Sequence, residues 1–190
     1  MPTTSAPFGI RPVNHPSGVI RPKRLENGIA SGYGTSLYQG VPISINTSGN
    51  IIISTGSDAI IGCFWGCEFT LAGRRMPLPY WPASTVPDTT GDPFFVYYFD
   101  DPSIVYEVQG AGSYAQTAIG DQANFSNLSA GAYPPGYSQA TLGTVVGAGS
   151  QGQFRIEALA PYVNNAWGDT YTIVQGKIAQ HQYVADKVAV

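Results

Sequence analysis

The chain has 190 residues and few charges: nine Lys and Arg and twelve Asp and Glu make up 11% of it, against about 25% in an ordinary soluble domain. Its longest nearly apolar run, residues 59–67, is about half as long as a membrane-spanning helix, which excludes a transmembrane protein and predicts no membrane partner. Because 43% of the residues are hydrophobic and 12% are aromatic, a substantial core can form, so disorder is excluded and one globular body is expected.

Residues 1–28 differ from the rest of the chain. Four basic residues against one acidic residue give this segment a charge of +3, and its five prolines recur every four to six residues, which prevents a helix. We expect an extended N-terminal arm that docks on another chain, with a disordered tail as the alternative. The arm residues expected to contact a partner are Phe8, Ile10, Arg11, Val13, Arg21, Lys23 and Arg24.

The first residues also lack the apolar stretch of a secretory signal, which predicts synthesis and residence in a cytoplasm. Cys63 and Cys67 are the only cysteines. Four residues apart along a strand, they lie beyond the reach of a disulfide. Two reduced thiols are therefore expected.

From residue 29 onward the sequence predicts strands. Val41, Ile43 and Ile45 alternate with Pro42, Ser44 and Asn46, and a turn of small polar residues separates them from residues 51–53, which predicts a β-hairpin. Further strands are expected within residues 59–70, 94–99, 104–108, 154–158 and 171–184. Helix is expected only as one or two turns near residues 157–165, where Pro161 limits it.

These short strands, with 23 Gly and 15 Pro between them, predict an antiparallel all-β barrel or sandwich. Residues 29–190 should form a single β domain with long irregular loops at about 72–93 and 126–152. Loops longer than about 12–15 residues are usually functional or mobile. Both loops are therefore candidate contact surfaces.

No motif predicts a cofactor, a metal or a nucleophile. Residues 147–152 match the dinucleotide pattern G-x-G-x-x-G, but a strand follows where the phosphate-binding helix should start, so a flexible hairpin connection is expected. Cys63 and Cys67 lie in a buried strand, where a thiol is inert. His15 and His181 lack the spacing of a zinc site. We expect no catalytic, cofactor-binding or metal-binding residue.

Asp100 and Asp101 are adjacent, so in a strand they would point to opposite faces and could not flank one glycosidic bond. Before Pro102 they predict a turn. A small hydrolase is the weakest alternative, because it needs Asp100, Asp101, Glu107 and His181 in one pocket. The isoelectric point of about 5.2 and the charge of −6 on residues 29–190 argue against nucleic acid as a partner.

The remaining signal is aromatic. Twelve Tyr, eight Phe and three Trp stand among few charges, as in the cores of protein interfaces. Exposed aromatic side chains could equally stack on sugars. The loop residues that we select for either role are Tyr80, Trp81, Tyr133 and Tyr137.

Several stretches resemble a known family. They are PFGIRPVNHPSG at 7–18, IASGYGT at 29–35, LYQGVP at 37–42, DAIIG at 58–62, YWP at 80–82 and IAQHQY at 178–183. Together they resemble the capsid decoration, or cement, proteins of tailed bacteriophages. The resemblance implies an all-β protein, commonly a β-tulip-like barrel, that binds the outside of an icosahedral shell as a trimer and has no catalytic residue.

The expected function is that of a virion structural protein, made in the cytoplasm of a bacterial host, that clamps neighbouring subunits of the major capsid protein and contacts copies of itself. The arm should be ordered only by another chain, and deletion of residues 1–26 should leave the β fold intact. The alternative is a carbohydrate- or host-surface-binding β module displayed on a phage particle.

Overall fold

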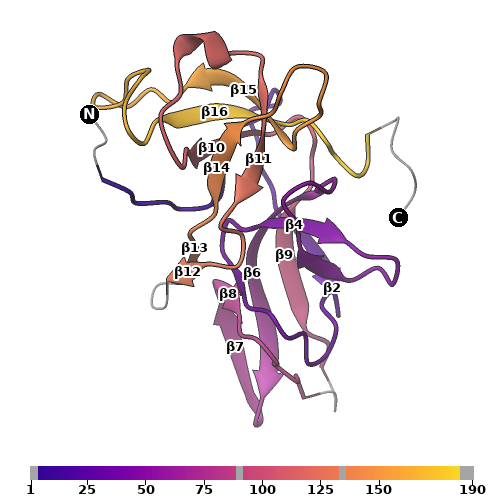
Figure 1. Cartoon of the computed structure of the whole chain (residues 1–190). Coiled ribbons are helices and arrows are strands. Elements are labelled where there is room, and N and C mark those ends of the chain that lie inside the picture. The colour runs from indigo at the N-terminus through magenta and orange to yellow at the C-terminus, as the bar shows by residue number, and fades with distance from the viewer. Residues whose placement is uncertain (1–3, 89–91, 133–135, 185–190) are drawn as a thin grey trace.

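The computed structural model describes residues 4–88, 92–132 and 136–184, and within them the chain is all-β apart from one short 3-10 helix, Gln116–Ala118. Sheet A contains, in spatial order, β1 (Ile10–Asn14), β10 (Val105–Gln109), β16 (Ile173–Ile178), β15 (Phe154–Leu159), β11 (Gln122–Ser126) and β14 (Thr141–Val145). Figure 1 shows this sheet in the upper half of the molecule.

Sheet B forms the lower half (Figure 1). Its strands, in spatial order, are β2 (Lys23–Glu26), β9 (Phe95–Phe99), β6 (Gly62–Leu71), β4 (Pro42–Ile45) and β5 (Ile51–Ile53), and β7 (Arg74–Leu78) also pairs with β6. Two short ribbons pair β3 (Leu37–Tyr38) with β8 (Tyr80–Trp81) and β12 (Gly131–Ala132) with β13 (Tyr137–Ser138). The pairings are antiparallel and neither sheet closes into a barrel, so the open, sandwich-like alternative is the correct one.

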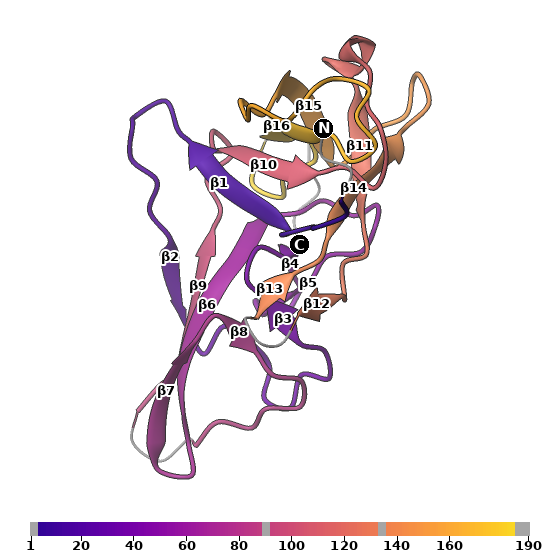
Figure 2. The same cartoon turned by 90° about the vertical axis from the view of Figure 1, so that its left-hand side faces the viewer.

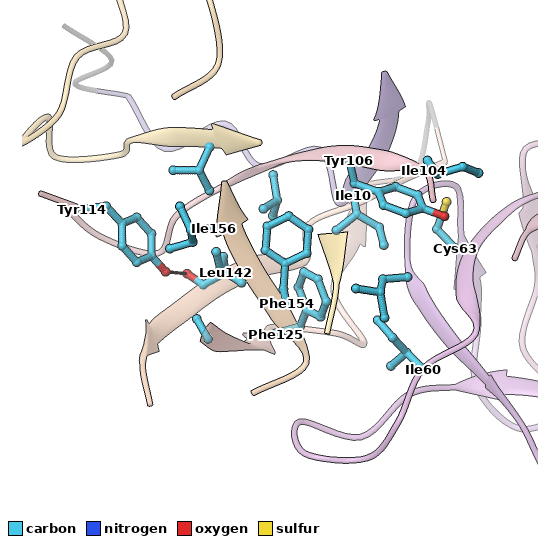
Figure 3. Packing of buried hydrophobic residues seen from close by; sticks show 14 of the residues in the cluster. Ile10, Ile60, Cys63, Ile104, Tyr106, Tyr114, Phe125, Leu142, Phe154 and Ile156 are labelled. Atoms are coloured by element: carbon cyan, nitrogen blue, oxygen red, sulfur yellow. Dashed lines mark hydrogen bonds between the residues drawn. The ribbon is translucent and has the colours of Figure 1, made fainter. Parts of the chain in front are cut away.

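Each sheet covers its own hydrophobic core. Phe125, Phe154 and Ile156 are buried in the core of sheet A (Figure 3). The core of sheet B includes the fully buried Phe64 and Trp81. Other side chains join the halves, because Ile60, Cys63 and Phe99, which lie in β6, in β9 or just before β6, pack into the core of sheet A. The two sheets therefore form one packed body.

Most expected strands are present, because alternation and β-branched runs report directly on strand geometry. The hairpin of β4 and β5 and the strands β6, β9, β10, β15 and β16 lie where the sequence predicts them. The helix near residues 157–165 was a wrong prediction. There β15 continues to Leu159, and the residues after it form turns around Pro161.

The two predicted loops are also partly wrong, because both contain strands. Residues 72–93 include β7 and β8, and Pro77 is tolerated since β7 pairs on one side only. Residues 126–152 include β12, β13 and β14. The segment 147–152 does not close a hairpin, because β11 lies between β14 and β15.

The N-terminal segment is not a separate arm. Its first strand, β1, pairs with β10 at the edge of sheet A, and its second, β2, pairs with β9 at the edge of sheet B. Since β9 and β10 follow each other in the chain, residues 10–26 run antiparallel along residues 95–108 and span both sheets, as Figure 2 shows. The division into an arm of residues 1–28 and a domain of residues 29–190 is therefore wrong. Prolines excluded a helix there but not an edge strand.

A close crossing of two glycines holds the start of this segment. The Ile10 amide donates to the Gly40 carbonyl at 2.8 Å, beside the turn between β3 and β4. Gly9 and Gly40 have φ angles of +73° and +82°, and a Cβ on Gly40 would lie 3.0 Å from the Phe8 carbonyl oxygen. Only glycine allows both the backbone conformation and the approach.

Candidate functional site

The structure places most of the predicted arm residues against the chain's own body. Ile10 is 1% exposed in the core of sheet A. Arg11 pairs with Glu107 at 2.8 Å and Lys23 pairs with Asp100 at 2.6 Å. The Arg24 guanidinium stacks over the ring of Phe95. The expectation that only another chain orders this segment is wrong, because Ile10, Arg11, Lys23 and Arg24 already have partners within the chain.

The other three predicted arm residues differ in exposure. Phe8 and Val13 are half-buried, and Arg21 is exposed. Arg21 lines a hollow of about 320 Å³ beside the connection from β1 to β2, together with His15 and Asp101. Phe8 lines a larger cleft and packs under the Arg11 guanidinium, whose carbon lies 4.8 Å from the ring centroid.

A polar cluster fixes Arg11 on the surface of sheet A. One Glu107 oxygen accepts hydrogen bonds from Arg11 Nη2 at 2.8 Å and from the Tyr162 hydroxyl at 2.7 Å, and the other accepts one from Gln175 Nε2 at 2.9 Å. Burial alone would raise the pKa of Glu107, but these three donors lower it below its ordinary value. Glu107 is therefore a buried carboxylate whose charge balances that of Arg11.

The start of the N-terminal segment forms one wall of a cleft between the two sheets. This N-terminal cleft has a volume of about 470 Å³. It is lined by Phe8, Ile10, Arg11, Gln39, Gly40, Trp65 and Tyr137. Four of these residues, Phe8, Ile10, Arg11 and Tyr137, are contact residues predicted from the sequence, and the fold brings them together. Trp65 and Gln39 were missed, since Trp65 belongs to a run that is apolar on both faces and Gln39 carries no local signal.

The predicted aromatic loop residues differ in their burial. Tyr137 is 48% exposed, whereas Trp81 is completely buried, because β8 pairs with β3 and its ring packs against Phe69 and Phe94. Tyr80 is half-buried and stacks on Tyr38. Tyr133 lies outside the described residues. The prediction of a contact through Trp81 is therefore wrong, and replacing Trp81 would report on stability instead of binding.

A second surface is the outward side of sheet B, which we call the aromatic–arginine face (Arg24, Glu68, Arg75, Phe95 and Tyr97). Arg24 and Arg75 stack on the ring of Phe95, with guanidinium carbons 4.3 and 5.3 Å from its centroid. Arg75 Nε donates to Glu68 at 2.9 Å, and the Tyr97 hydroxyl donates to the same carboxylate at 3.3 Å. Both arginines are exposed, and Phe95 and Tyr97 are half-buried. The strands involved, β2, β9, β6 and β7, lie side by side in Figure 2.

The two thiols are buried and free, as expected. Burial raises the pKa of Cys67 to about 12 and raises that of Cys63 even further. The Cys63 sulfur lies beside the Tyr106 hydroxyl in the core (Figure 3), and the Cys67 thiol donates to the Tyr80 carbonyl at 3.2 Å. Both are core side chains.

The carboxylates considered for hydrolysis are held by different partners. Asp100 is buried and pairs with Lys23, whereas Asp101 pairs with His15 at 3.2 Å and accepts the Ser103 amide in the predicted turn. Glu107 pairs with Arg11. In the described ranges, no group of three or more His, Cys, Asp and Glu side chains is arranged to hold a metal ion.

His181 makes stability depend on pH. It is 1% exposed, and Nε2 has no hydrogen-bond partner among the described residues. Burial lowers its pKa below the ordinary value of 6.5, although Asp100 and Asp101 oppose the shift. Below pH 6.5 the unfolded chain therefore binds more protons than the native chain, and the free energy of unfolding should fall as pH decreases.

We expect a slope of at most about 1.4 kcal/mol per pH unit from this one group between pH 6.5 and 5. Urea denaturation at several pH values measures it. In His181→Gln the slope should be smaller, whatever the variant's absolute stability. An identical slope in the variant would contradict this role of His181.

In the comparison with known proteins, no family model, no curated protein and no solved structure matches the chain. None of the helical residues in the described ranges belongs to a helix long and apolar enough to cross a membrane.

Proposed function

We propose that this chain is a virion structural protein that binds the outer surface of a phage capsid and stabilises the expanded shell. It is made in the cytoplasm of the bacterial host, and its partners are the major capsid protein and copies of itself, most simply in a trimer. It is not an enzyme, and it needs neither nucleic acid nor a membrane. Besides the sequence resemblance, the observation that carries the proposal is the aromatic–arginine face, because Tyr, Phe and Arg are enriched in protein interfaces.

The structure changes how such a protein would hold the shell. Because residues 10–14 and 23–26 are edge strands of its own sheets, the protein cannot clamp its neighbours with this segment as a free arm. A preformed surface is used instead, and it loses little conformational entropy on binding. Repetition of the contact over a symmetric shell then gives avidity, so each contact can be modest.

The test is cosedimentation with undecorated, expanded capsids of the encoding phage, together with the disruption temperature of those capsids. Arg24→Ala and Arg75→Ala should each weaken binding about tenfold, or about 1.4 kcal/mol, because each removes a guanidinium stacked on Phe95. Arg155→Ala is the matched control: Arg155 is also exposed and pairs locally with Glu157, at 2.9 Å.

Arg155→Ala should bind like the unchanged protein. No cosedimentation at micromolar concentration would exclude the proposal. Binding that all three substitutions leave equal would show that the shell is bound through another surface.

A further inference from the structure

We propose that the N-terminal cleft binds a neutral saccharide of about one or two rings. This inference is independent of shell binding through the aromatic–arginine face, and it places the sugar contact away from the loop residues first considered. The cleft's volume of about 470 Å³ lies in the range of small-ligand sites, about 300–1,000 Å³. Its lining combines aromatic rings with a few fixed polar groups.

The aromatic rings come from three separate parts of the chain. Trp65 is half-buried in β6, Phe8 precedes β1, and Tyr137 is the exposed first residue of β13. Trp65 is held edge-on by Phe99, with centroids 5.1 Å apart and planes at 74°. A ring fixed in this way loses little freedom when a ligand stacks on it. The apolar C–H face of a pyranose is a suitable partner for such a surface.

The polar groups of the cleft suit hydroxyls. Gln39 Nε2 donates to the Trp65 carbonyl at 3.1 Å, which orients the amide and leaves its oxygen able to accept. Arg11 uses Nη2 for Glu107 and Tyr162, so Nε and Nη1 remain able to donate. A sugar hydroxyl both donates and accepts, so it can satisfy an amide oxygen and a guanidinium together.

The charge balance of the cleft favours a neutral ligand over an anionic one. The Arg11 charge is balanced by the buried Glu107 carboxylate, which the surrounding donors keep ionised. The two opposite charges cancel, so the cleft offers no net attraction to a phosphate, a sulfate or an acidic sugar. A neutral ligand with many hydroxyls fits these contacts best.

The cleft is also preformed. The Gly9–Gly40 crossing joins two of its walls. Backbone hydrogen bonds join Gln39 to the β13 ribbon: the Gln39 backbone amide donates to the Gly136 carbonyl at 3.0 Å, and the Ser138 backbone amide donates to the Gln39 carbonyl at 2.9 Å. The N-terminal segment, the turn after β3 and the β13 ribbon therefore meet in one fixed arrangement.

The experiment is an isothermal titration of the whole protein with cellobiose, lactose, mannobiose and diacetylchitobiose, followed by a glycan array. At least one neutral disaccharide should bind saturably at millimolar concentration or tighter. Tyr137→Ala should weaken this binding more than tenfold, while Tyr137→Phe should keep most of it because the stacking surface remains. Tyr183→Ala is the control, since Tyr183 is similarly exposed, at 54%, but does not line the cleft.

Circular dichroism and the thermal midpoint of Tyr137→Ala should match those of the unchanged protein, because the side chain is exposed. No saturable binding of any neutral sugar, binding of acidic sugars alone, or equal binding by Tyr137→Ala would each overturn the proposal. Shell cosedimentation should be unchanged in Tyr137→Ala. Loss of shell binding in this variant would instead make the cleft a protein contact and also overturn the saccharide assignment.

Discussion

Deletion of residues 1–26 is expected to disrupt the fold of the whole protein. The deletion removes β1 and β2 and so leaves β10 and β9 as bare sheet edges. It also removes the Ile10 side chain, which is 1% exposed, and truncating a buried Ile alone costs about 2–5 kcal/mol. Together with the lost strand pairing, the loss in free energy of unfolding should exceed about 4 kcal/mol. This is a large part of the usual stability of a domain, about 5–15 kcal/mol.

Urea denaturation followed by far-ultraviolet circular dichroism measures this effect. The truncated protein should show a strongly reduced midpoint or aggregate. A shorter truncation that removes only residues 1–3 leaves the strand pairings of β1 and β2 in place, so its midpoint should fall far less than that of the longer truncation. A native spectrum and midpoint after deletion of residues 1–26 would contradict this prediction and support the free arm that the sequence suggests.

Gly9→Ala should also lower the free energy of unfolding strongly. Gly9 has a φ angle of +73°, and an added Cβ would overlap the Gly40 carbonyl oxygen and lie 2.9 Å from the Ser138 Cβ. Gly18→Ala is a close control, because Gly18 has a φ angle of +75° but nothing within 4 Å of an added Cβ. The control isolates the cost of the left-handed conformation, which is about 1–2 kcal/mol.

Gly9→Ala should lower the free energy of unfolding by about 3 kcal/mol or more, because the backbone around Gly40 must move in addition to that conformational cost. The difference between the two free energies of unfolding, from urea denaturation, measures the close crossing itself. The variant should also lose saccharide binding, since the crossing holds one wall of the cleft. Equal losses in Gly9→Ala and Gly18→Ala would mean that the crossing contributes nothing.

The two proposed surfaces have separate binding functions. The aromatic–arginine face lies on sheet B, and the N-terminal cleft lies where the two sheets meet. Because the Arg24, Arg75 and Tyr137 substitutions affect different surfaces, shell binding and sugar binding can be lost separately. A protein with both sites would hold the shell with one surface and present the other to a host or environmental glycan.

Some functional residues could be predicted from the sequence because their signal is local. Phe8 and Arg11 stand out in a proline-rich basic segment, and Tyr137 stands out in a Gly- and Pro-rich stretch. Their meeting in one cleft could not be predicted, since Tyr137 follows Arg11 by more than a hundred residues. Trp81 shows the opposite error: beside Pro82 it suggests an exposed loop, but pairing with β3 buries it completely.

Local sequence patterns were enough to predict the fold class, the hairpin of β4 and β5, the buried reduced thiols and most of the strands. Period-two alternation and β-branched composition act within a few residues, so they can be read without knowing the partners. Two features depend on tertiary contacts: β1 and β2 are edge strands of the two sheets, and the charge of Arg11 is balanced by Glu107. These contacts join residues that lie about 70 to 100 positions apart. Alternation says which face a side chain takes but not which strand lies beside it.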